Sequence, residues 1–178
     1  MKVLGVLTSG GDSQGMNAAV RAVVRTARAQ GMKVIGIHDG YKGLIDGHVE
    51  ELTETSVSDI IAKGGTFLRT ARCLEFKEEA GMQKAIATLK KHEIDGVIAI
   101  GGDGTFRGAK ALSKHGINVI AIPATIDNDI CCTNYSIGFD TAANTAIDCI
   151  DKLRDTMQSH ERCSVVEVMG RHAGFLAM

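Results

Sequence analysis

The chain has 178 residues, a length that fits one domain or two small ones. Apolar residues make up 44% of it and its mean hydropathy is +0.05, which excludes a disordered chain and a membrane-embedded one. The formal charge of −1 excludes a broadly basic surface that recruits nucleic acid, and aromatic residues are too scarce, at 4%, for base-stacking platforms. Glycine is the outlier, with 21 residues against one proline. We therefore expect the function to lie in glycine-rich turns.

The N-terminus shows no targeting signal, because the apolar run of residues 3–7 is too short for the core of a signal peptide. No apolar run approaches the roughly 18 residues of a membrane span, so we expect a cytoplasmic protein that binds neither membranes nor nucleic acid. The five cysteines are odd in number and lack C-x-x-C spacing, which disfavours a disulfide framework and a zinc site. We interpret them as reduced and mostly packing residues: Cys73, Cys131, Cys132, Cys149 and Cys163.

Short apolar, β-branched runs alternate along the chain with longer segments of helical periodicity. This rhythm is typical of an α/β fold in which helices connect parallel strands. We predict strands at residues 3–7, 33–37, 95–100, 118–122 and 164–168. Between them, apolar residues recur at helical spacing, and we expect these stripes to pack on the sheet. The stripes contain Met16, Ala19, Val20, Val23 and Ala27, then Met82, Ile86 and Leu89, then Ala143, Ile147, Ile150 and Leu153.

Two of the predicted strands run into Gly-Gly-Asp, as Gly10-Gly11-Asp12 and Gly101-Gly102-Asp103. Ligands of open α/β sheets bind beyond the carboxyl ends of the strands, where glycines let backbone N–H groups approach an anion. We interpret both as phosphate-binding turns, with Asp103 beside the phosphates as a ligand for Mg²⁺ and with Gly102, Gly104 and Gly108 keeping the second turn clear. Neither turn is a P-loop or a dinucleotide fingerprint. Each one alone also fits a tight turn with a helix cap.

A third segment, Pro123-Ala124-Thr125-Ile126-Asp127-Asn128-Asp129, directly follows the predicted strand 118–122. Two carboxylates and a hydroxyl therefore emerge at the carboxyl end of a strand. A carboxylate in this place can accept the proton of an attacking hydroxyl during phosphoryl transfer. Taken alone, the segment equally fits an Asx-rich turn that caps the next helix.

The arginines add one further pattern. Asn17, Arg21, Arg25 and Arg28 share one face of a predicted helix, which fits either a solvated surface or a phosphate site. Arg171 follows the predicted strand 164–168 and is thus expected near the carboxyl edge of the sheet. The histidines form no metal-binding motif, and the absence of G-x-S-x-G disfavours acyl hydrolysis. The chemistry points to phosphoryl groups.

At these residues the sequence resembles the bacterial ATP-dependent 6-phosphofructokinases over its whole length. Four blocks carry the resemblance, at residues 5–12, 100–105, 123–129 and 168–174. The resemblance implies a phosphotransferase with an alcohol acceptor, which moves the ATP γ-phosphoryl group to the 1-hydroxyl of fructose 6-phosphate. It also implies a mostly parallel sheet flanked by helices, and a family chain that continues past this length. Residues 1–137 would form the N-terminal part of the ATP-binding domain, and residues 138–178 the truncated start of the fructose 6-phosphate domain.

The resemblance also implies roles for individual residues. Asp127 would be the base, and Thr125, Arg171 and Gly11 would act on the transferred phosphoryl group. The ATP site would contain Gly11, Arg72, Cys73, Gly102, Asp103, Gly104 and Thr105, with Asp103 holding Mg²⁺. Fructose 6-phosphate would contact Thr125, Ile126, Asp127, Met169, Gly170 and Arg171, and also Arg162 from a neighbouring subunit. A site where ADP and phosphoenolpyruvate compete would contain Arg21, Arg25, Asp59 and Arg154, in a homotetramer.

Two small residues bear on the choice of phosphoryl donor. In the pyrophosphate-using relatives an aspartate stands where Gly104 is and a lysine where Ala124 is, and an aspartate would repel the α-phosphate of ATP. The sequence therefore predicts ATP as the donor. It departs from the family pattern at Cys73 and at Thr55, where some members carry aromatic residues, and at the pair 131–132, for which the sequence offers no physical account.

Two alternatives remain open. Gly-Gly-Asp-Gly-Thr is shared with kinases of NAD and of diacylglycerol, although the other three blocks favour the sugar phosphate kinase. The second alternative is a piece of the enzyme that binds nucleotide without catalysis. ATP titration together with an assay of fructose 6-phosphate turnover separates these possibilities.

Overall fold

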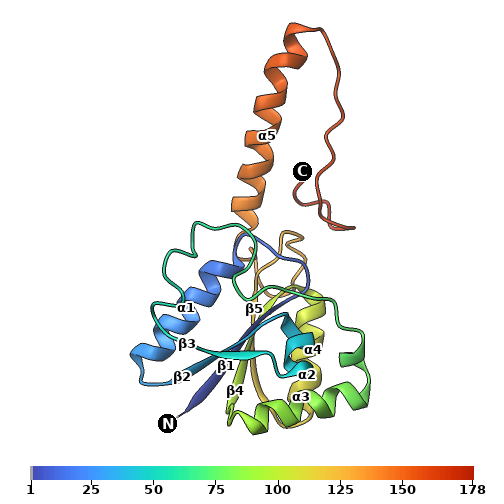
Figure 1. The fold of residues 1–178 in the computed structure, drawn as a ribbon. Helices are drawn as coiled ribbons and strands as arrows, with labels where there is room; N and C mark the ends of the chain where they lie inside the picture. Colours follow the sequence, from blue (N-terminus) through green and yellow to red (C-terminus); the bar gives the residue numbers. More distant parts are fainter. Residues whose placement is uncertain (1) are drawn as a thin grey trace.

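The computed structural model describes residues 2–178, which form a five-stranded sheet with helices on both faces (Figure 1). The strand order is β3-β2-β1-β4-β5. The strands are β1 (Val3–Ser9), β2 (Lys33–Ile37), β3 (Val49–Leu52), β4 (Gly96–Gly101) and β5 (Asn118–Pro123). The helices are α1 (Met16–Ala29), α2 (Gly40–Asp46), the 3-10 turn η1 (Glu75–Lys77), α3 (Glu79–Lys91), α4 (Asp103–Lys114) and α5 (Phe139–Ser159).

Four of the five predicted strands are present, and they form the parallel part of the sheet. β1 pairs in parallel with β2 on one side and with β4 on the other, and β4 pairs in parallel with β5. The remaining strand, β3, is antiparallel to β2 at the sheet edge and was not predicted. It is short, and its two central residues, Glu50 and Glu51, are exposed, so no apolar run marks it.

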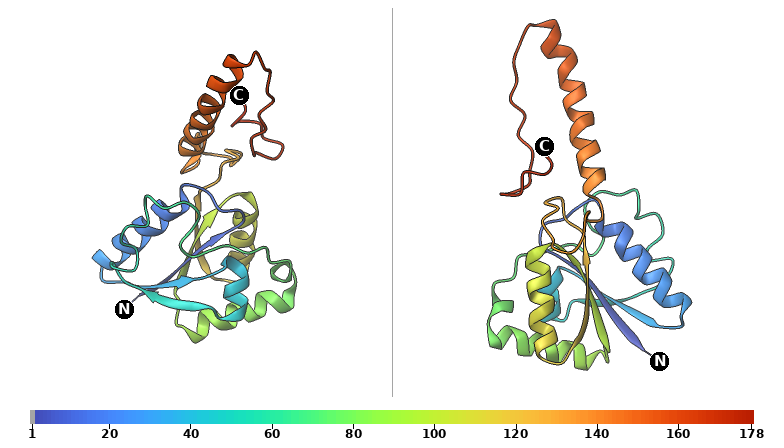
Figure 2. Two further views of the ribbon diagram at one scale, coloured as in Figure 1. Left: turned by 45° about the horizontal axis from the view of Figure 1, so that its top comes forward. Right: turned by 180° about the vertical axis from the view of Figure 1, so that it is seen from behind.

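The two faces of the sheet are covered by different helices. One apolar cluster contains α1 together with Val6 of β1 and Ile100 of β4. The other contains α2, α3 and α4 packed on Leu7 and Ala99. The helix after β1 and the helix after β4 therefore lie on opposite faces (Figure 2). Adjacent parallel strands whose helices diverge in this way open a crevice at their carboxyl ends, where α/β proteins bind ligands.

Helix α5 does not pack on the sheet as predicted. It projects away from the carboxyl edge of the sheet, and residues 160–178 run back beside it (Figure 1). Its apolar stripe is open to solvent, with Ile147 55% exposed and Leu153 46% exposed. The stripe instead faces residues of the returning segment across a hollow of about 420 Å³ lined by Ile150, Val166, Phe175 and others. Helical periodicity identified the helix, but it carries no information about which surface the apolar face meets.

The predicted strand at 164–168 is also wrong. This segment is irregular and largely exposed, with Val165 97% exposed, and residues 171–177 form isolated turns rather than a helix. An extended β-branched run becomes a strand only when a neighbouring strand accepts its hydrogen bonds, and the described sheet ends at β5. Within residues 2–178 no helix is long and apolar enough to span a membrane.

Candidate active site at the carboxyl ends of β1, β4 and β5

The three chemistry-bearing segments of the sequence lie side by side in the structure. Ser9 at the end of β1 pairs with Gly101 at the end of β4, and Gly101 pairs with Pro123 at the end of β5. Both Gly-Gly-Asp turns and the segment from Thr125 to Asp129 thus leave the same edge of the sheet from adjacent strands. The sequence prediction that they share one edge is confirmed by this register.

The turn after β4 is held against the end of β1 by close packing. The Thr105 hydroxyl donates a hydrogen bond to the Ser9 carbonyl at 2.8 Å, and both residues are buried. A Cβ atom at Gly101 would lie 2.4 Å from the same Ser9 oxygen, so only glycine fits between the two strands' ends. Because its hydroxyl is already used, Thr105 has only its backbone N–H to offer a phosphate.

Helix α2 supports the turn after β4 through Tyr41. The buried Tyr41 hydroxyl donates to the Thr105 carbonyl at 2.6 Å, and the Tyr41 ring stacks on Phe76 with centroids 4.1 Å apart. Burial raises the pKa of Tyr41, which keeps the phenol protonated and able to donate. Gly108 lies against the same ring, since a Cβ there would come within 2.5 Å of it. The expectation that Gly108 keeps the phosphate turn clear is therefore wrong: it makes room for Tyr41.

Gly11 and Gly104 border open space, whereas Gly102 is enclosed. Among the described residues nothing lies within 4 Å of a Cβ built at Gly11 or at Gly104. A Cβ at Gly102 would lie 3.3 Å from Thr125 Cβ. Gly102 thus brings the turn after β4 against the segment after β5, and the two open glycines leave backbone surface that a phosphate chain can approach.

Asp103 begins helix α4 and is next in sequence to the open Gly104. Its side chain is 46% exposed and pairs with Arg107 one turn along the helix, with Oδ2 2.9 Å from Nη2. The described residues contain no group of three or more His, Cys, Asp or Glu side chains arranged to hold a metal. Mg²⁺ typically takes one or two carboxylates and completes its shell with phosphate oxygens and water, and Asp103 is a carboxylate that can serve in this way.

Asp127 is the most enclosed carboxylate of the third segment. Its side chain is 15% exposed, its backbone N–H donates to the Thr125 hydroxyl at 3.2 Å, and its Oδ2 lies 3.8 Å from Arg171 Nε. Two hydrogen bonds at Ala124 fix the position of this segment against the other two turns. Ser13 donates its hydroxyl to the Ala124 carbonyl at 3.0 Å, and the Ala124 N–H donates to the Gly101 carbonyl at 3.0 Å. The turns after β1, β4 and β5 are thereby joined by hydrogen bonds.

A family model described as phosphofructokinase matches residues 3–178 of this chain. The chain belongs to the phosphofructokinase family. It is 62% identical over 178 residues to the ATP-dependent 6-phosphofructokinase of Clostridium novyi, and 60% identical over 179 residues to that of Thermoanaerobacter sp. X514. In each case all of this chain is covered but only 56% of the relative, so the chain spans about half the length of the curated relatives it matches.

Solved phosphofructokinases share the fold. The Saccharomyces cerevisiae enzyme superposes with a TM-score of 0.92 at 36% identity, over 99% of this chain and 27% of that one. A pyrophosphate-dependent phosphofructokinase from Marinobacter aquaeolei superposes with a TM-score of 0.79 at 24% identity, over 99% of this chain and 48% of that one. This second match bears on the fold alone.

Other residues that the family resemblance assigned to the active site belong to segments that do not directly follow β1, β4 or β5 in the sequence. Arg72 is exposed, and Cys73 is half-buried against the apolar cluster of α2 and α3. Arg162, Met169 and Gly170 lie in the segment that follows α5, where Met169 is 80% exposed. Of this segment, Arg171 is the residue that the structure brings to Asp127.

The residues expected to form a family effector site are only partly gathered. Arg21 of α1 donates through Nη1 to the Val57 carbonyl at 2.9 Å, which ties the helix to the loop that contains Asp59. Arg25 is exposed one turn farther along α1. Arg154 lies on the projecting helix α5 and pairs with Asp151. One chain therefore supplies Arg21, Arg25 and Asp59 from one region and Arg154 from another.

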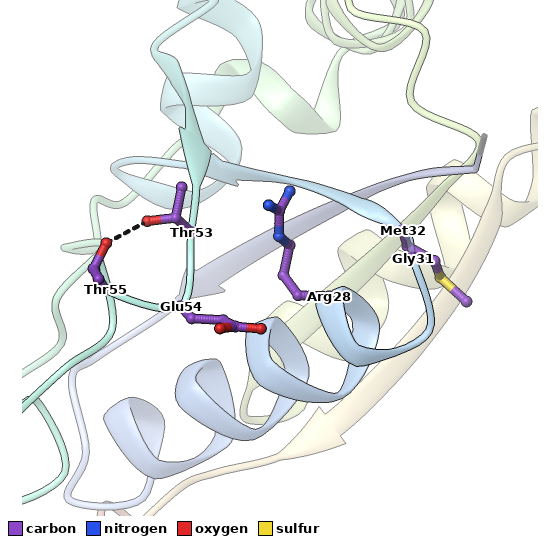
Figure 3. A pocket seen from close by; sticks show the side chains of 6 residues that line it. All are labelled: Arg28, Gly31, Met32, Thr53, Glu54 and Thr55. Carbon is purple, nitrogen blue, oxygen red and sulfur yellow. Dashed lines mark hydrogen bonds between the residues drawn. The ribbon is translucent and has the colours of Figure 1, made fainter.

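A hollow of about 440 Å³ lies at the carboxyl end of α1, beside the segment that follows β3 (Figure 3). Arg28 points into the space between them, and the hydroxyls of Thr53 and Thr55 are 2.8 Å apart. Arg28 Nη1 also lies 3.6 Å from Glu51 Oε1, so the arginine face predicted from the sequence is partly used in ion pairing. The lining residues are Arg28, Gly31, Met32, Thr53, Glu54 and Thr55.

Sequence reasoning missed four residues that position the site. Tyr41 and Ser13 hold the turns described above, and Thr8 donates its hydroxyl to the Arg69 carbonyl at 2.8 Å. Asn17, interpreted from the sequence as part of an exposed basic face, is in fact buried: its side chain donates to the Lys63 carbonyl at 3.0 Å and accepts from the Phe67 N–H at 2.7 Å. A polar residue inside an apolar helix or strand pattern was the signal that could have identified them, because a buried polar group needs a hydrogen-bond partner.

Proposed function

We propose that this chain is the N-terminal half of an ATP-dependent 6-phosphofructokinase, which transfers the γ-phosphoryl group of ATP to the 1-hydroxyl of fructose 6-phosphate. The observation that carries the proposal is the close approach of Gly102 and Thr125, which brings the segment that contains Asp127 against the open Gly-Gly-Asp-Gly turn. A general base and a phosphate-binding turn in this arrangement fit direct transfer from nucleotide to hydroxyl.

In the proposed reaction Asp127 accepts the proton of the attacking hydroxyl. Its carboxylate is held near the Arg171 guanidinium, which stabilises the negative charge of the base and then that of the phosphoryl group in transit. The open backbone at Gly11 and Gly104 approaches the phosphate chain, and Thr125 lies against Gly102 of the second turn. Asp103, whose exposed carboxylate now pairs with Arg107, would be the protein ligand for Mg²⁺, and the metal would supply charge neutralisation on the phosphates.

The open space at Gly104 supports ATP as the donor. An aspartate at this position has room for its side chain and projects a carboxylate into the surface that the phosphates approach. Ala124 is buried in the cluster under α1, where a lysine does not fit without displacing packed side chains. Relatives at 60% identity and above carry the name ATP-dependent 6-phosphofructokinase.

The remaining parts of the proposal concern the whole enzyme. We propose an ATP-binding unit at residues 1–137 and the start of a substrate unit at 138–178, with α5 projecting from the sheet as support for this division. The separation of Arg154 from Arg21 and Arg25 supports an effector site for ADP and phosphoenolpyruvate that is shared between subunits of a tetramer. Arg162 would likewise reach a neighbouring subunit's fructose 6-phosphate, in a cytoplasmic glycolytic enzyme.

A second function, nucleotide binding without catalysis, is favoured by one observation. The apolar stripe of α5 is exposed and the chain spans about half its relatives, so the substrate unit is incomplete here. The deciding experiment is a coupled assay for fructose 1,6-bisphosphate on this chain and on a chain extended at its C-terminus to the length of the relatives. Activity that appears on extension supports the kinase, whereas ATP binding without turnover in both chains leaves only the binding function.

A further inference from the structure

We propose that Cys131 and Cys132 form a redox-sensitive dithiol that closes reversibly to a disulfide between neighbouring residues. The two residues lie in the connection between β5 and α5, and Cys131 comes two residues after Asp129. Both are exposed, whereas Cys73 is half-buried against the core. No other pair of cysteines in the sequence is adjacent.

The loop that presents this pair is closed at its base by one side chain. Asn128 donates its amide to the Asn134 carbonyl at 3.2 Å, and its Oδ1 accepts from the Ser136 N–H at 2.9 Å. These two bonds join the residues on either side of the cysteines. Cys132 has a φ of 68°, a left-handed conformation that non-glycine residues adopt at some cost, so the chain already turns sharply at the pair.

The chemistry proceeds by thiol–disulfide exchange with a low-molecular-weight disulfide. One cysteine thiolate attacks a sulfur of the small disulfide, forms a mixed disulfide and releases one small thiol. The neighbouring cysteine then attacks the protein sulfur and releases the second small thiol. Two protein thiols are oxidised, the small disulfide gains two electrons, and the two cysteine protons end on the two released thiols.

The geometry predicts that this disulfide is easily reduced. Cα atoms joined by a trans peptide are about 3.8 Å apart, which is shorter than the roughly 4.4–6.8 Å of ordinary disulfides. Strained and exposed disulfides have higher reduction potentials and are the labile ones. Ring closure therefore distorts the backbone at 131–132, and the distortion is passed to the Asn128 hydrogen bonds that close the loop next to Asp127. An effect on phosphoryl transfer rests on the proposed function, whereas the thiol chemistry does not.

The test is oxidation of the protein with oxidised glutathione, followed by alkylation of free thiols and mass spectrometry. We expect the peptide that contains positions 131 and 132 to lose the mass of two hydrogen atoms and both alkylatable thiols, and to regain them with dithiothreitol, whereas the exposed Cys149 and Cys163 keep any glutathione that they bind. The same change in this peptide is expected in Cys149→Ser and Cys163→Ser, which remove the other exposed cysteines. In Cys131→Ser and Cys132→Ser we expect one glutathione bound to the remaining cysteine of the pair, because no neighbouring thiol can displace it.

Two results overturn the proposal. Alkylation of both Cys131 and Cys132 after oxidation shows that the pair does not react, and stable glutathione on the unaltered pair shows that the ring does not close. A second measurement is the midpoint of thermal unfolding, which we expect to fall on oxidation of the unaltered protein and of Cys149→Ser. In Cys131→Ser this fall is expected to be absent. Because neither readout requires kinase activity, their failure is distinguishable from failure of the proposed function.

Discussion

Arg171 reaches the carboxylate of Asp127, with its Nε 3.8 Å from Oδ2, although Arg171 lies in an irregular segment beyond α5. The arginine is 72% exposed while the aspartate is 15% exposed, so the two differ in how firmly they are held. Asp127 is fixed by the strand that precedes it. Arg171 is therefore held less firmly, and in the proposed reaction it leaves this carboxylate for the phosphoryl group.

Both the charge and the planar shape of the Arg171 side chain should matter for phosphoryl transfer. Arg171→Ala in the extended chain should lower kcat more than it raises KM, because the guanidinium acts mainly on charge that develops in the transition state. Arg171→Lys should recover only part of the loss, since a lysine lacks the planar fork. Steady-state kinetics with varied fructose 6-phosphate check this. Equal losses in both variants would show that planarity matters more than charge.

Asp127→Ala should lower kcat by at least about 10²-fold, the effect of removing a general base. ATP binding, measured by calorimetry, should remain, because the proposed role of this carboxylate is toward the acceptor hydroxyl and not toward the nucleotide. Asp129→Ala is the matched control on the same loop, since Asp129 is exposed. A fully active Asp127→Ala variant would assign the proton transfer to another group.

Gly104→Asp should abolish the use of ATP while leaving the fold intact, because a side chain at this position meets open space. The carboxylate instead meets the phosphates of the nucleotide. Gly104→Asn, which has the same size without the charge, is the matched control. The measurement is kcat/KM for ATP together with the thermal midpoint, and an unchanged kcat/KM would contradict the argument on donor choice.

Tyr41→Phe should destabilise the protein by about 1 kcal/mol, the usual net value of one hydrogen bond, and more if the Thr105 carbonyl stays unpaired. Burial raises the Tyr41 pKa above its ordinary value of 10.0, so above that pH the unfolded chain loses this proton before the folded one does. The tyrosine therefore costs stability as the pH rises past 10.0, and this part of the loss should vanish in Tyr41→Phe. Urea denaturation on both sides of this pH measures the difference.

Gly101→Ala should be far more damaging than Gly11→Ala, although both glycines belong to Gly-Gly-Asp turns. A Cβ at Gly101 would lie 2.4 Å from the Ser9 oxygen and from Thr105 Oγ1, whereas one at Gly11 meets nothing. We expect a loss of stability in the first and little change in the second, with any loss of function at Gly11 confined to phosphate binding. Thermal unfolding and ATP titration of the pair separate these effects.

The parallel strands and the turn motifs could be predicted because their signals are local. The apolar runs predicted as strands at 3–7 and 95–100 form β1 and β4, and Gly-Gly-Asp at their ends marks the edge where open α/β sheets bind ligands. The contact of Tyr41 with Thr105 joins residues 64 apart in the chain, and no local pattern announces it. The stripe of α5 and the run at 164–168 have local signals whose partners are absent from the described sheet, so the same reasoning gave the right helix and a wrong strand.

The central position of β1 in the sheet has a consequence for how the protein is made. Among the described strands β1 comes first in the chain, but its neighbour β4 ends only at Gly101, and the hydroxyl of Thr105 that joins the two turns lies later still. One edge of β1 therefore stays unpaired until β4 has been synthesised, and exposed strand edges invite wrong pairing. The two Gly-Gly-Asp turns are joined only once Thr105, in the first turn of α4, is in place.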